Sequence, residues 1–288
     1  MNSKAKFPAI FRNLTSLKAL YLSYNFHSNL QIPTTLGNLC NLHSLSLSYL
    51  DLSSEPNMAR IFSGCIKHSL VELYLSNTSI QGSLPDWSWT LTKLKVLDLS
   101  SNNINSTICP SWLYKVHGLE NLNLGSNSLH GPIPANIDEI MGSLKILDIS
   151  YNQGLSLPRS LGNLCNLQRL ALSGLDLSQD TAKSQQIFSG CIIQSLKVLE
   201  LAETKLQGDI PYWVNSLKNL QWLDLNDNQI NSTLPPWLFN LTSISFLDLS
   251  YNDFHGSIPS IIENMYLLEE IYLDLNSHLE GPIPMTLW

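Results

Sequence analysis

The amino-acid sequence predicts an α/β-type solenoid, in which short repeats stack to build one parallel β-sheet with few helices. Three observations lead to this prediction. An apolar residue recurs about every 24 residues and begins the same run of alternating leucines each time. Most of these runs end on an asparagine, and a turn rich in Gly and Pro follows many of them. We predict eleven repeats, whose first residues are at positions 17, 42, 70, 94, 119, 144, 167, 196, 220, 244 and 268.

The run from Leu94 to Asn102 shows why each repeat forms a strand. Leu97 and Leu99 lie two residues apart and point to one side, whereas Val96 and Asp98 point to the other. No repeat can bury its leucines alone, so stacking joins the leucine sides into one continuous core. The opposite side becomes an exposed, concave face.

The asparagine at the end of the run is the second regular feature. Its amide offers two donors and one acceptor, so it can satisfy backbone groups that a buried bend leaves unpaired. Four repeats carry Leu50, Thr78, Leu175 or Thr204 at this position instead. We predict a structural ladder formed by Asn25, Asn102, Asn127, Asn152, Asn228, Asn252 and Asn276.

The turn that follows is the third feature, as in the stretch Gly131-Pro132-Ile133-Pro134. Gly permits a positive φ, and Pro lacks a backbone donor and ends strand pairing. The full repeat, LxxLxLxxNxLxGxIP, resembles the plant-specific subtype of leucine-rich repeats over nearly the whole chain. That resemblance implies a concave parallel sheet, a second short sheet at the Gly-x-Ile-Pro stretches and a right-handed superhelix.

A block of repeats occurs twice. Residues 37–42 match residues 162–167, residues 61–65 match residues 187–191, and residues 105–107 match residues 231–233. The block near 14–139 is therefore duplicated near 141–264. Because a solenoid grows as one continuous unit, we predict a single domain over residues 1–288.

Four of the five cysteines bracket the two longest repeats, at corresponding places in the two copies. We predict the disulfides Cys40–Cys65 and Cys165–Cys191. The alternative is four free thiols in the core, because Cys is among the most buried residues. A zinc site is not expected, since neither pair has close Cys-x-x-Cys spacing. Cys109 is left over, and its counterpart is Pro235.

Five segments fit the Asn-x-Ser/Thr acceptor pattern for N-linked glycans. A chain rich in Asn, Ser and Thr also produces this pattern by chance, so the alternative is that the sites stay bare. The predicted glycosylation sites are Asn13, Asn77, Asn105, Asn231 and Asn240.

The sequence contains no pattern that indicates an enzyme. It has no phosphate-binding glycine loop, no nucleophile elbow and no zinc-binding His pair. Asp98, Asp148, Asp224 and Asp248 recur at one strand position, and we interpret them as a polar ladder rather than as paired catalytic carboxylates. We expect no catalysis, no metal and no cofactor.

Binding is expected on the exposed face, where aromatic side chains lie beside carboxylates. Trp and Tyr dominate energetic hot spots at interfaces. The alternative is that any solenoid must expose some large residues there. Earlier repeats offer Tyr21, Glu72 and Tyr74. The predicted binding residues of the last repeats are Trp222, Asp224, Asn226, Phe246, Asp248, Glu270, Tyr272 and Asp274.

Charge and hydropathy limit the possible partners and location. The net charge is −7, and the 16 Lys and Arg residues are scattered, which argues against nucleic acid and against an anionic membrane surface. No apolar run reaches the 18 residues or so of a membrane span. The short apolar stretch at residues 7–11 is also too brief for a secretory signal.

Within the plant leucine-rich repeats, the Gly-Asn-Leu-Cys-Asn-Leu and Ser-Gly-Cys elements resemble receptor-like proteins of the fungal-elicitor (xylanase) receptor type. This resemblance implies the ectodomain of a kinase-lacking receptor at the plasma membrane. Such an ectodomain binds an extracellular peptide, protein or glycan and signals through partner receptor kinases. The family's signal peptide, caps and membrane span have no counterpart here, so we expect a fragment or a truncated product.

Two alternatives fit the same repeats. The chain could come from the ectodomain of a leucine-rich-repeat receptor kinase, or from a cell-wall binder similar to polygalacturonase inhibitors. An intracellular scaffold is disfavoured, because paired cysteines indicate an oxidising compartment.

Overall fold

The computed structural model describes residues 13–25, 32–53, 58–84, 91–108, 118–178, 185–282 and 284. Cys109, the apolar stretch at residues 7–11 and Ile283 of the last Gly-x-Ile-Pro turn lie outside these residues. The chain divides into two compact units, Met1–Leu144 and Lys145–Trp288. Each is described by itself below.

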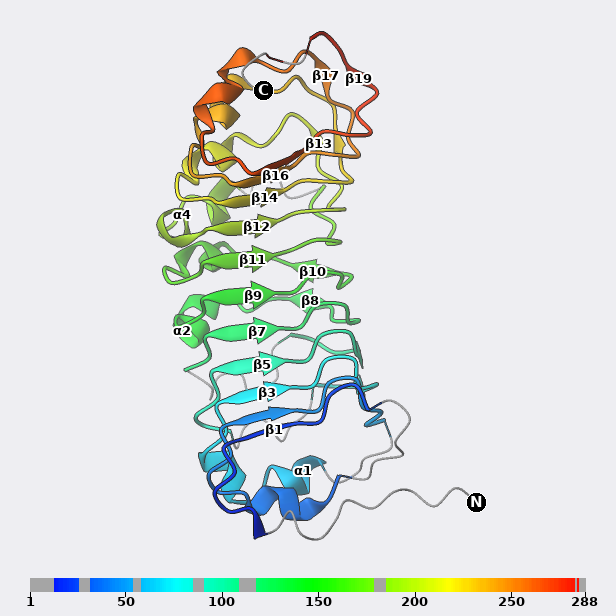
Figure 1. Ribbon diagram of the computed structural model, residues 1–288, viewed down its shortest axis with the longest axis vertical. Coiled ribbons are helices and arrows are strands. Elements are labelled where there is room, and N and C mark those ends of the chain that lie inside the picture. Colours follow the sequence, from blue (N-terminus) through cyan, green and yellow to red (C-terminus); the bar gives the residue numbers. More distant parts are fainter. Residues whose placement is uncertain are drawn as a thin grey trace, which may run out of the picture. The chain divides into compact units, whose positions relative to one another are not determined.

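In the first unit, five short parallel strands form the main sheet in the order β1-β2-β3-β5-β7. They are coloured blue to green in Figure 1. Their bounds are β1 Ala19–Tyr21, β2 Ser44–Ser46, β3 Glu72–Tyr74, β5 Val96–Asp98 and β7 Asn121–Asn123. The remaining elements are η2 Thr34–Asn38, α1 Met58–Ile61, η3 Cys65–His68, β4 Gln81–Gly82, β6 Asn103–Ile104, β8 Gly131–Pro132 and α2 Ile137–Met141.

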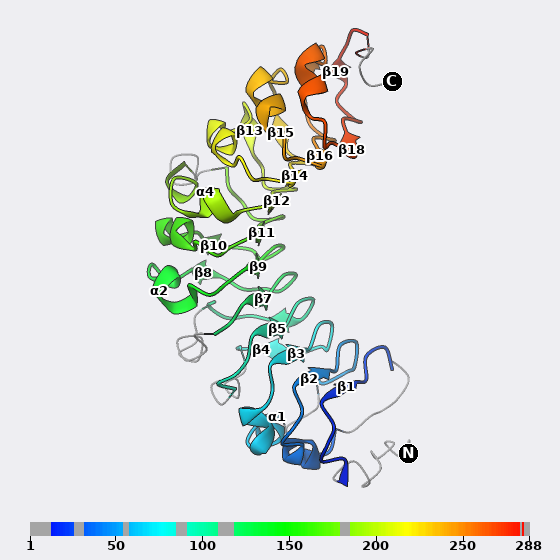
Figure 2. The same cartoon turned by 60° about the vertical axis from the view of Figure 1, so that its left-hand side comes forward.

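In the second unit, six parallel strands follow in the order β9-β11-β12-β14-β16-β18. Figure 2 shows its short helices on the side away from these strands. The strands are β9 Ile146–Asp148, β11 Arg169–Ala171, β12 Val198–Glu200, β14 Trp222–Asp224, β16 Phe246–Asp248 and β18 Glu270–Tyr272. The helical turns are η6 Arg159–Asn163, α4 Ile192–Ser195, η7 Tyr212–Ser216, η8 Pro236–Asn240 and η9 Ser260–Asn264, and the short strands are β10 Leu155–Ser156, β13 Gln207–Gly208, β15 Gln229–Ile230, β17 His255–Gly256 and β19 His278–Leu279.

Two-residue strands pair where the Gly-x-Ile-Pro turns begin. β4 pairs with β6 in the first unit, and β13 with β15 and β17 with β19 in the second, all in parallel. An isolated bridge extends the short sheet in each unit, Thr107↔His130 in the first and Thr233↔His255 in the second. These pairs, the parallel main strands and the few short helices confirm the predicted fold class.

The leucine side of each strand forms the core. Leu199, Leu223 and Leu247 occupy one register position in neighbouring strands of the second unit and are fully buried. Each makes its contacts with the equivalent leucine of the next repeat, so the core is continuous within the unit. Burying such a side chain contributes about 1.5–3 kcal/mol.

Every strand of the main sheet ends in a left-handed bend. The residue before the ladder position has a positive φ in all eleven repeats, and Gly174 is the only glycine among them. A non-glycine residue in this conformation costs about 1–2 kcal/mol. The cost is offset by the hydrogen bonds that the next side chain makes.

Those hydrogen bonds are clearest at Asn228. Its Oδ1 accepts from the backbone N–H groups of Thr204 and Leu206, at 3.0 Å each. Its Nδ2 donates to the carbonyls of Leu201 and Leu225, at 2.8 and 2.9 Å. One amide therefore joins the bends of two neighbouring repeats.

Thr204, one of the four departures from asparagine, completes this network. It is fully buried, and its hydroxyl lies 2.7 Å from the Leu201 carbonyl and 3.1 Å from Asn228 Oδ1. Thr78 occupies the same environment beside Asn102 in the first unit.

Both predicted disulfides, Cys40–Cys65 and Cys165–Cys191, are present. Each lies beside a pair of glycines whose backbones touch. A Cβ atom on Gly64 would overlap the carbonyl oxygen of Gly37, and one on Gly190 would overlap that of Gly162. The repeated Gly-Asn-Leu-Cys and Ser-Gly-Cys elements are therefore a packing device, in which glycine allows the close approach and the disulfide fixes it.

Candidate functional site

The candidate site lies on the outward side of the last three strands of the second unit. Strand register places the predicted residues in two columns across β14, β16 and β18. The first column contains Trp222, Phe246 and Glu270, and the second contains Asp224, Asp248 and Tyr272. We call these six residues the aromatic–acidic patch.

Two aromatic rings form the centre of this patch. The indole of Trp222 stacks on the ring of Phe246 with 3.5 Å between ring centroids and an angle of 6° between the planes. Tyr272 lies 5.5 Å from Phe246 in a tilted arrangement. Trp222 is 37% exposed and Tyr272 is 42% exposed. The sheet therefore presents a rigid apolar surface to solvent rather than hiding these rings in the core.

Each of the two aspartates accepts a hydrogen bond from the backbone N–H group two residues further along, just after its own strand. Asp248 Oδ1 accepts from the backbone N–H of Ser250 at 2.9 Å and from its hydroxyl at 2.6 Å. Asp224 Oδ1 accepts from the N–H of Asn226 at 3.0 Å. The Asn226 amide then donates to Asp248 Oδ2 at 3.3 Å, which connects the two strands. The same Asp–Ser pattern at Asp98 and Asp148 gives the predicted aspartate column a structural role.

The environment of Asp224 opposes its negative charge. The pKa of this carboxyl is raised to about 6, chiefly by burial and also by the neighbouring charges of Asp248 and Glu200, while the hydrogen bond from the N–H of Asn226 opposes the shift. An acidic group that titrates near neutral pH thus lies directly beside the aromatic stack.

Glu270 and Asp274 are exposed at the outer side of the patch. The Tyr272 hydroxyl donates to Glu270 Oε2 at 2.7 Å, and this bond to a carboxylate raises the pKa of the tyrosine. The structure thus brings together all eight predicted binding residues on one face of the second unit.

Some residues on this face were missed from sequence. Tyr151 donates to Glu203 Oε1 at 3.0 Å across Gly174, where a Cβ would lie 2.6 Å from the Tyr151 ring. Both occupy the left-handed bend, so the position before each ladder residue was the signal that could have identified them. Arg169 and Glu200 form an ion pair at 2.8 Å on neighbouring strands.

The earlier candidates lie in the first unit. Tyr21 and Tyr74 occupy one column but are separated by Ser46, so no ring stack forms between them. Burial raises the pKa of Tyr74, and the nearby Glu72 raises it further. The stacked aromatic pair of the first unit lies at the bends instead, where Tyr24 and Tyr49 pack with 4.2 Å between ring centroids.

The five predicted glycosylation sites are all exposed, and a glycan could reach each of them without unfolding. In the second unit, Asn231 donates through Nδ2 to Asp253 Oδ2 at 2.8 Å. The exposed sites are Asn13, Asn77, Asn105, Asn231 and Asn240. Their occupancy stays a prediction.

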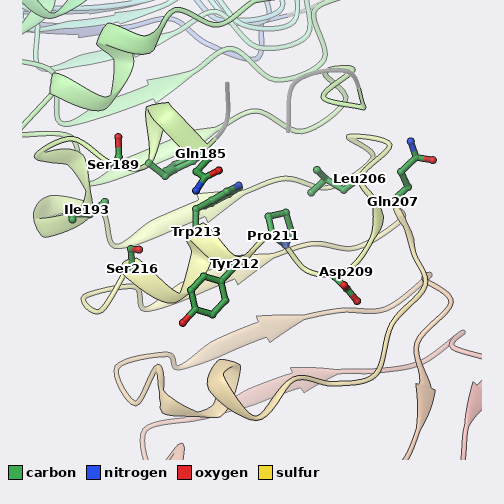
Figure 3. A pocket seen from close by; sticks show the side chains of 11 residues that line it. Gln185, Ser189, Ile193, Leu206, Gln207, Asp209, Pro211, Tyr212, Trp213 and Ser216 are labelled. Carbon is green, nitrogen blue, oxygen red and sulfur yellow. The ribbon is translucent and has the colours of Figure 1, made fainter. Parts of the chain in front are cut away.

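A hollow of about 620 Å³ lies on the helical side of the second unit (Figure 3). Its floor is formed by Trp213, which stacks on Phe188 with 3.9 Å between ring centroids. Tyr212 is 70% exposed at its edge, and Gln185, Gln207 and Asp209 line its rim. Its size suits a small ligand, and sequence analysis did not identify it.

Within the described ranges, no three or more His, Cys, Asp or Glu side chains gather in a way that could hold a metal ion. Across the same part of the chain, no helix has the length and apolar character that crossing a bilayer requires.

Comparison with known families matches the repeats directly. A family model described as "Leucine rich repeat" matches residues 68–129 and 194–254, and a second, "Leucine Rich Repeat", matches residues 143–164. No curated protein matches the chain by sequence.

Solved structures give similar folds. The leucine-rich-repeat ectodomain of the plant membrane receptor kinase GASSHO1/SCHENGEN3 from Arabidopsis thaliana, in complex with CASPARIAN STRIP INTEGRITY FACTOR 2, is 27% identical with a TM-score of 0.67. A TDR receptor is 25% identical with a TM-score of 0.69. The ectodomain of the Arabidopsis receptor kinase HAESA, in complex with an N-terminally extended IDA peptide hormone, is 25% identical with a TM-score of 0.59.

Each alignment covers 98% of this chain, but the chain spans only 35%, 51% and 53% of the three proteins in the order given. The parallel strands of the eleven repeats, the asparagine bends and the matched repeat models all indicate the same kind of repeat. The chain is a leucine-rich-repeat protein with structural similarity to plant receptor ectodomains.

Proposed function

We propose that this chain is part of a plant receptor ectodomain that binds an extracellular peptide or protein ligand on the aromatic–acidic patch. The observation that carries the proposal is the stacked pair Trp222–Phe246, exposed on the sheet face between carboxylates. Exposed aromatic rings of fixed geometry are the usual centres of binding energy. Three structures of similar fold are receptors, and two of them are in complex with named ligands.

Binding rather than catalysis fits the chemistry of this face. The carboxylate of Asp248 accepts from Ser250 and Asn226, which fixes it at the strand ends, although Oδ2 can still accept a further donor. A general acid or base needs a free position from which to reach a substrate. We therefore assign no reaction to the patch.

The complete protein would be a kinase-lacking receptor at the outer face of the plasma membrane, signalling through partner receptor kinases in trans. The paired disulfides and exposed glycosylation sites support an oxidising, secretory route. The fungal-elicitor receptor type is the nearest resemblance of the Gly-Asn-Leu-Cys and Ser-Gly-Cys elements.

The second candidate is the ectodomain of a receptor kinase. It is favoured by the two similar structures that are named as receptor kinases. Sequencing the complete transcript distinguishes the two, because only the second candidate encodes a kinase domain. A complete transcript with neither a kinase nor a membrane span would instead favour a cell-wall binder similar to polygalacturonase inhibitors.

Selection of random linear peptides displayed on phage tests the binding proposal. The target is the chain 1–288, and the comparison is the double variant Trp222→Ala, Phe246→Ala. A matched control is Val96→Ala, because Val96 occupies the position in the first copy that corresponds to Trp222.

We expect peptides that bind the unaltered chain and the Val96→Ala variant but bind the double variant at least tenfold more weakly, a difference of about 1.4 kcal/mol or more. Thermal melts of all three proteins check that the loss comes from the patch. Peptides that bind all three equally would place the binding site elsewhere.

A further inference from the structure

We propose that the ligand segment bound by the aromatic–acidic patch is cationic, and that it places an arginine side chain across the exposed edges of the Trp222–Phe246 stack with its guanidinium between the carboxylates of Asp248 and Glu270. This inference rests on the proposed function and identifies the chemistry of the ligand. It is built from the charge distribution of the last repeats, the hydrogen bonds of the carboxylates and the geometry of the rings.

The charge distribution of the sequence changes abruptly at Lys218. Residues 219–288 contain nine Asp and Glu and not a single Lys or Arg. All three strands of the patch lie in this segment. No lysine or arginine of the same repeats balances the negative potential there, and the ion pair of His278 involves Asp253 rather than a carboxylate of the patch. Such a surface attracts a cationic partner.

The carboxylates of the patch interact only with neutral donors in the described contacts. Asp248 accepts from Ser250 and Asn226, Asp224 from Asn226, and Glu270 from the Tyr272 hydroxyl. One strand away the arrangement differs, because Glu200 is neutralised by Arg169 at 2.8 Å. The patch therefore lacks the internal cation that the neighbouring repeat has.

Like charges in the patch repel one another. Asp248 and Glu200 both raise the pKa of Asp224 beyond the effect of its burial. A cation bound here would relieve this repulsion as well as form its own contacts. The gain is therefore larger for a charged ligand group than for a neutral one of equal size.

The placing of the carboxylates selects arginine among cations. A planar guanidinium can donate to two carboxylates at once, whereas the ammonium of lysine is a compact point charge. Phe246 covers the face of Trp222 that is turned toward Asp248 and Glu270, so the arginine crosses the exposed edges of the two rings. The stack holds these rings in place, so little side-chain freedom is lost on binding.

Phe246 lies between Trp222 and Glu270 in its column, and Asp248 lies between Asp224 and Tyr272 in the neighbouring one. Neighbouring strands are about 4.8 Å apart. A side chain that crosses the exposed edge of Phe246 can therefore reach the carboxylates of β16 and β18, as an extended peptide crossing the sheet would allow.

The peptide selection described above also tests this inference. Peptides that need Trp222 and Phe246 are sequenced, and we expect enrichment in arginine. Each is then synthesised with arginine replaced by citrulline, which keeps the shape and removes the charge. We expect about tenfold weaker binding for citrulline and weaker binding of the arginine peptide at high salt.

Charge variants of the protein give the second measurement. Glu270→Gln combined with Asp274→Asn changes two exposed residues and should not affect folding. It should weaken the binding of arginine peptides about fivefold and the binding of citrulline peptides by a smaller factor. The control Glu263→Gln removes an exposed charge from η9, on the helical side, and should change neither.

The outcomes separate the two proposals. Two results would overturn the proposal of a cationic ligand: patch-dependent peptides without basic residues, or equal binding of arginine and citrulline peptides. Either result would leave the proposed binding site standing. The absence of any patch-dependent peptide would overturn the proposed function and this inference with it.

Discussion

Asn228 shows how one side chain holds two repeats together. Its six polar contacts are divided between its own bend and the preceding one, and the residue is buried. The role of this position could be predicted from sequence, because one amide offers two donors and a carbonyl acceptor at the same time. The part played by Thr204 could not, because its hydroxyl acts only in combination with the asparagine of the next repeat.

Replacing Asn228 by alanine should destabilise the protein by about 3 kcal/mol, because it leaves the buried N–H groups of Thr204 and Leu206 without their acceptor. Urea denaturation followed by circular dichroism measures the change. Asn25→Ala is the matched control, since Asn25 is exposed and donates to carbonyls of its own bend. A loss at Asn228 no greater than at Asn25 would contradict the proposed bridging role.

Asp224 should make stability depend on pH. Its pKa of about 6 lies above the value of about 3.9 in an unfolded chain. The folded state therefore binds the proton more tightly, and the resulting stabilisation is complete below pH 4 and is lost as the pH rises through 6. Asp224→Asn removes this loss while keeping an oxygen that can accept from Asn226.

The free energy of unfolding of Asp224→Asn, relative to the unaltered chain, should accordingly rise between pH 4 and pH 7. Urea denaturation at both values measures it. Because the carboxyl is only partly buried, we expect a modest difference. A difference that stays constant with pH would show that Asp224 titrates as in a free peptide.

At the scale of elements, the regular parts of the repeat were predictable and the irregular parts were not. Alternating leucines with an exposed residue between them predict the position of a three-residue strand such as β14 unambiguously. The turns between strands are different, because four- and five-residue helices such as α4 and η7 depend on packing against the neighbouring repeat. The patch was predictable because strand alternation decides which side chains face outward, whereas the Trp222–Phe246 stack depends on register between repeats.

The close contact between Gly162 and Gly190 gives a prediction for the second unit. Gly190→Ala should destabilise the protein by at least about 2 kcal/mol, because a Cβ would collide with backbone rather than with a movable side chain. Thermal melts measure the shift. Gly118→Ala serves as the control, since nothing lies within 4 Å of its added Cβ, and there we expect no loss.

Equal tolerance of alanine at residues 190 and 118 would mean that the backbones around the Cys165–Cys191 disulfide can separate at little cost. The glycines would then not be needed for the close approach, and the disulfide alone would hold it.

At the scale of the whole chain, the cysteines and the acceptor asparagines make a joint prediction. A chain secreted from plant cells behind an added signal peptide should contain both disulfides and carry glycans, including at Asn105 and Asn231. These two asparagines correspond in the two copies, and both are exposed. Mass spectrometry before and after glycosidase treatment measures both properties.

Asn→Gln at each acceptor should remove one glycan mass and leave folding intact. Secreted, folded material with free thiols and bare asparagines would contradict the extracellular interpretation and revive the intracellular scaffold.

The two copies of the duplicated block share the residues that hold the fold together but differ in the side chains that face outward from the sheet. Corresponding places in the two copies keep the disulfide and the glycine contact, yet Val96 in one copy corresponds to Trp222 in the other. Residues that form the core and residues that face outward alternate along the same three-residue strand. A lineage that duplicates such repeats can therefore acquire a new specificity by exchanging every second residue, without passing through an unstable intermediate.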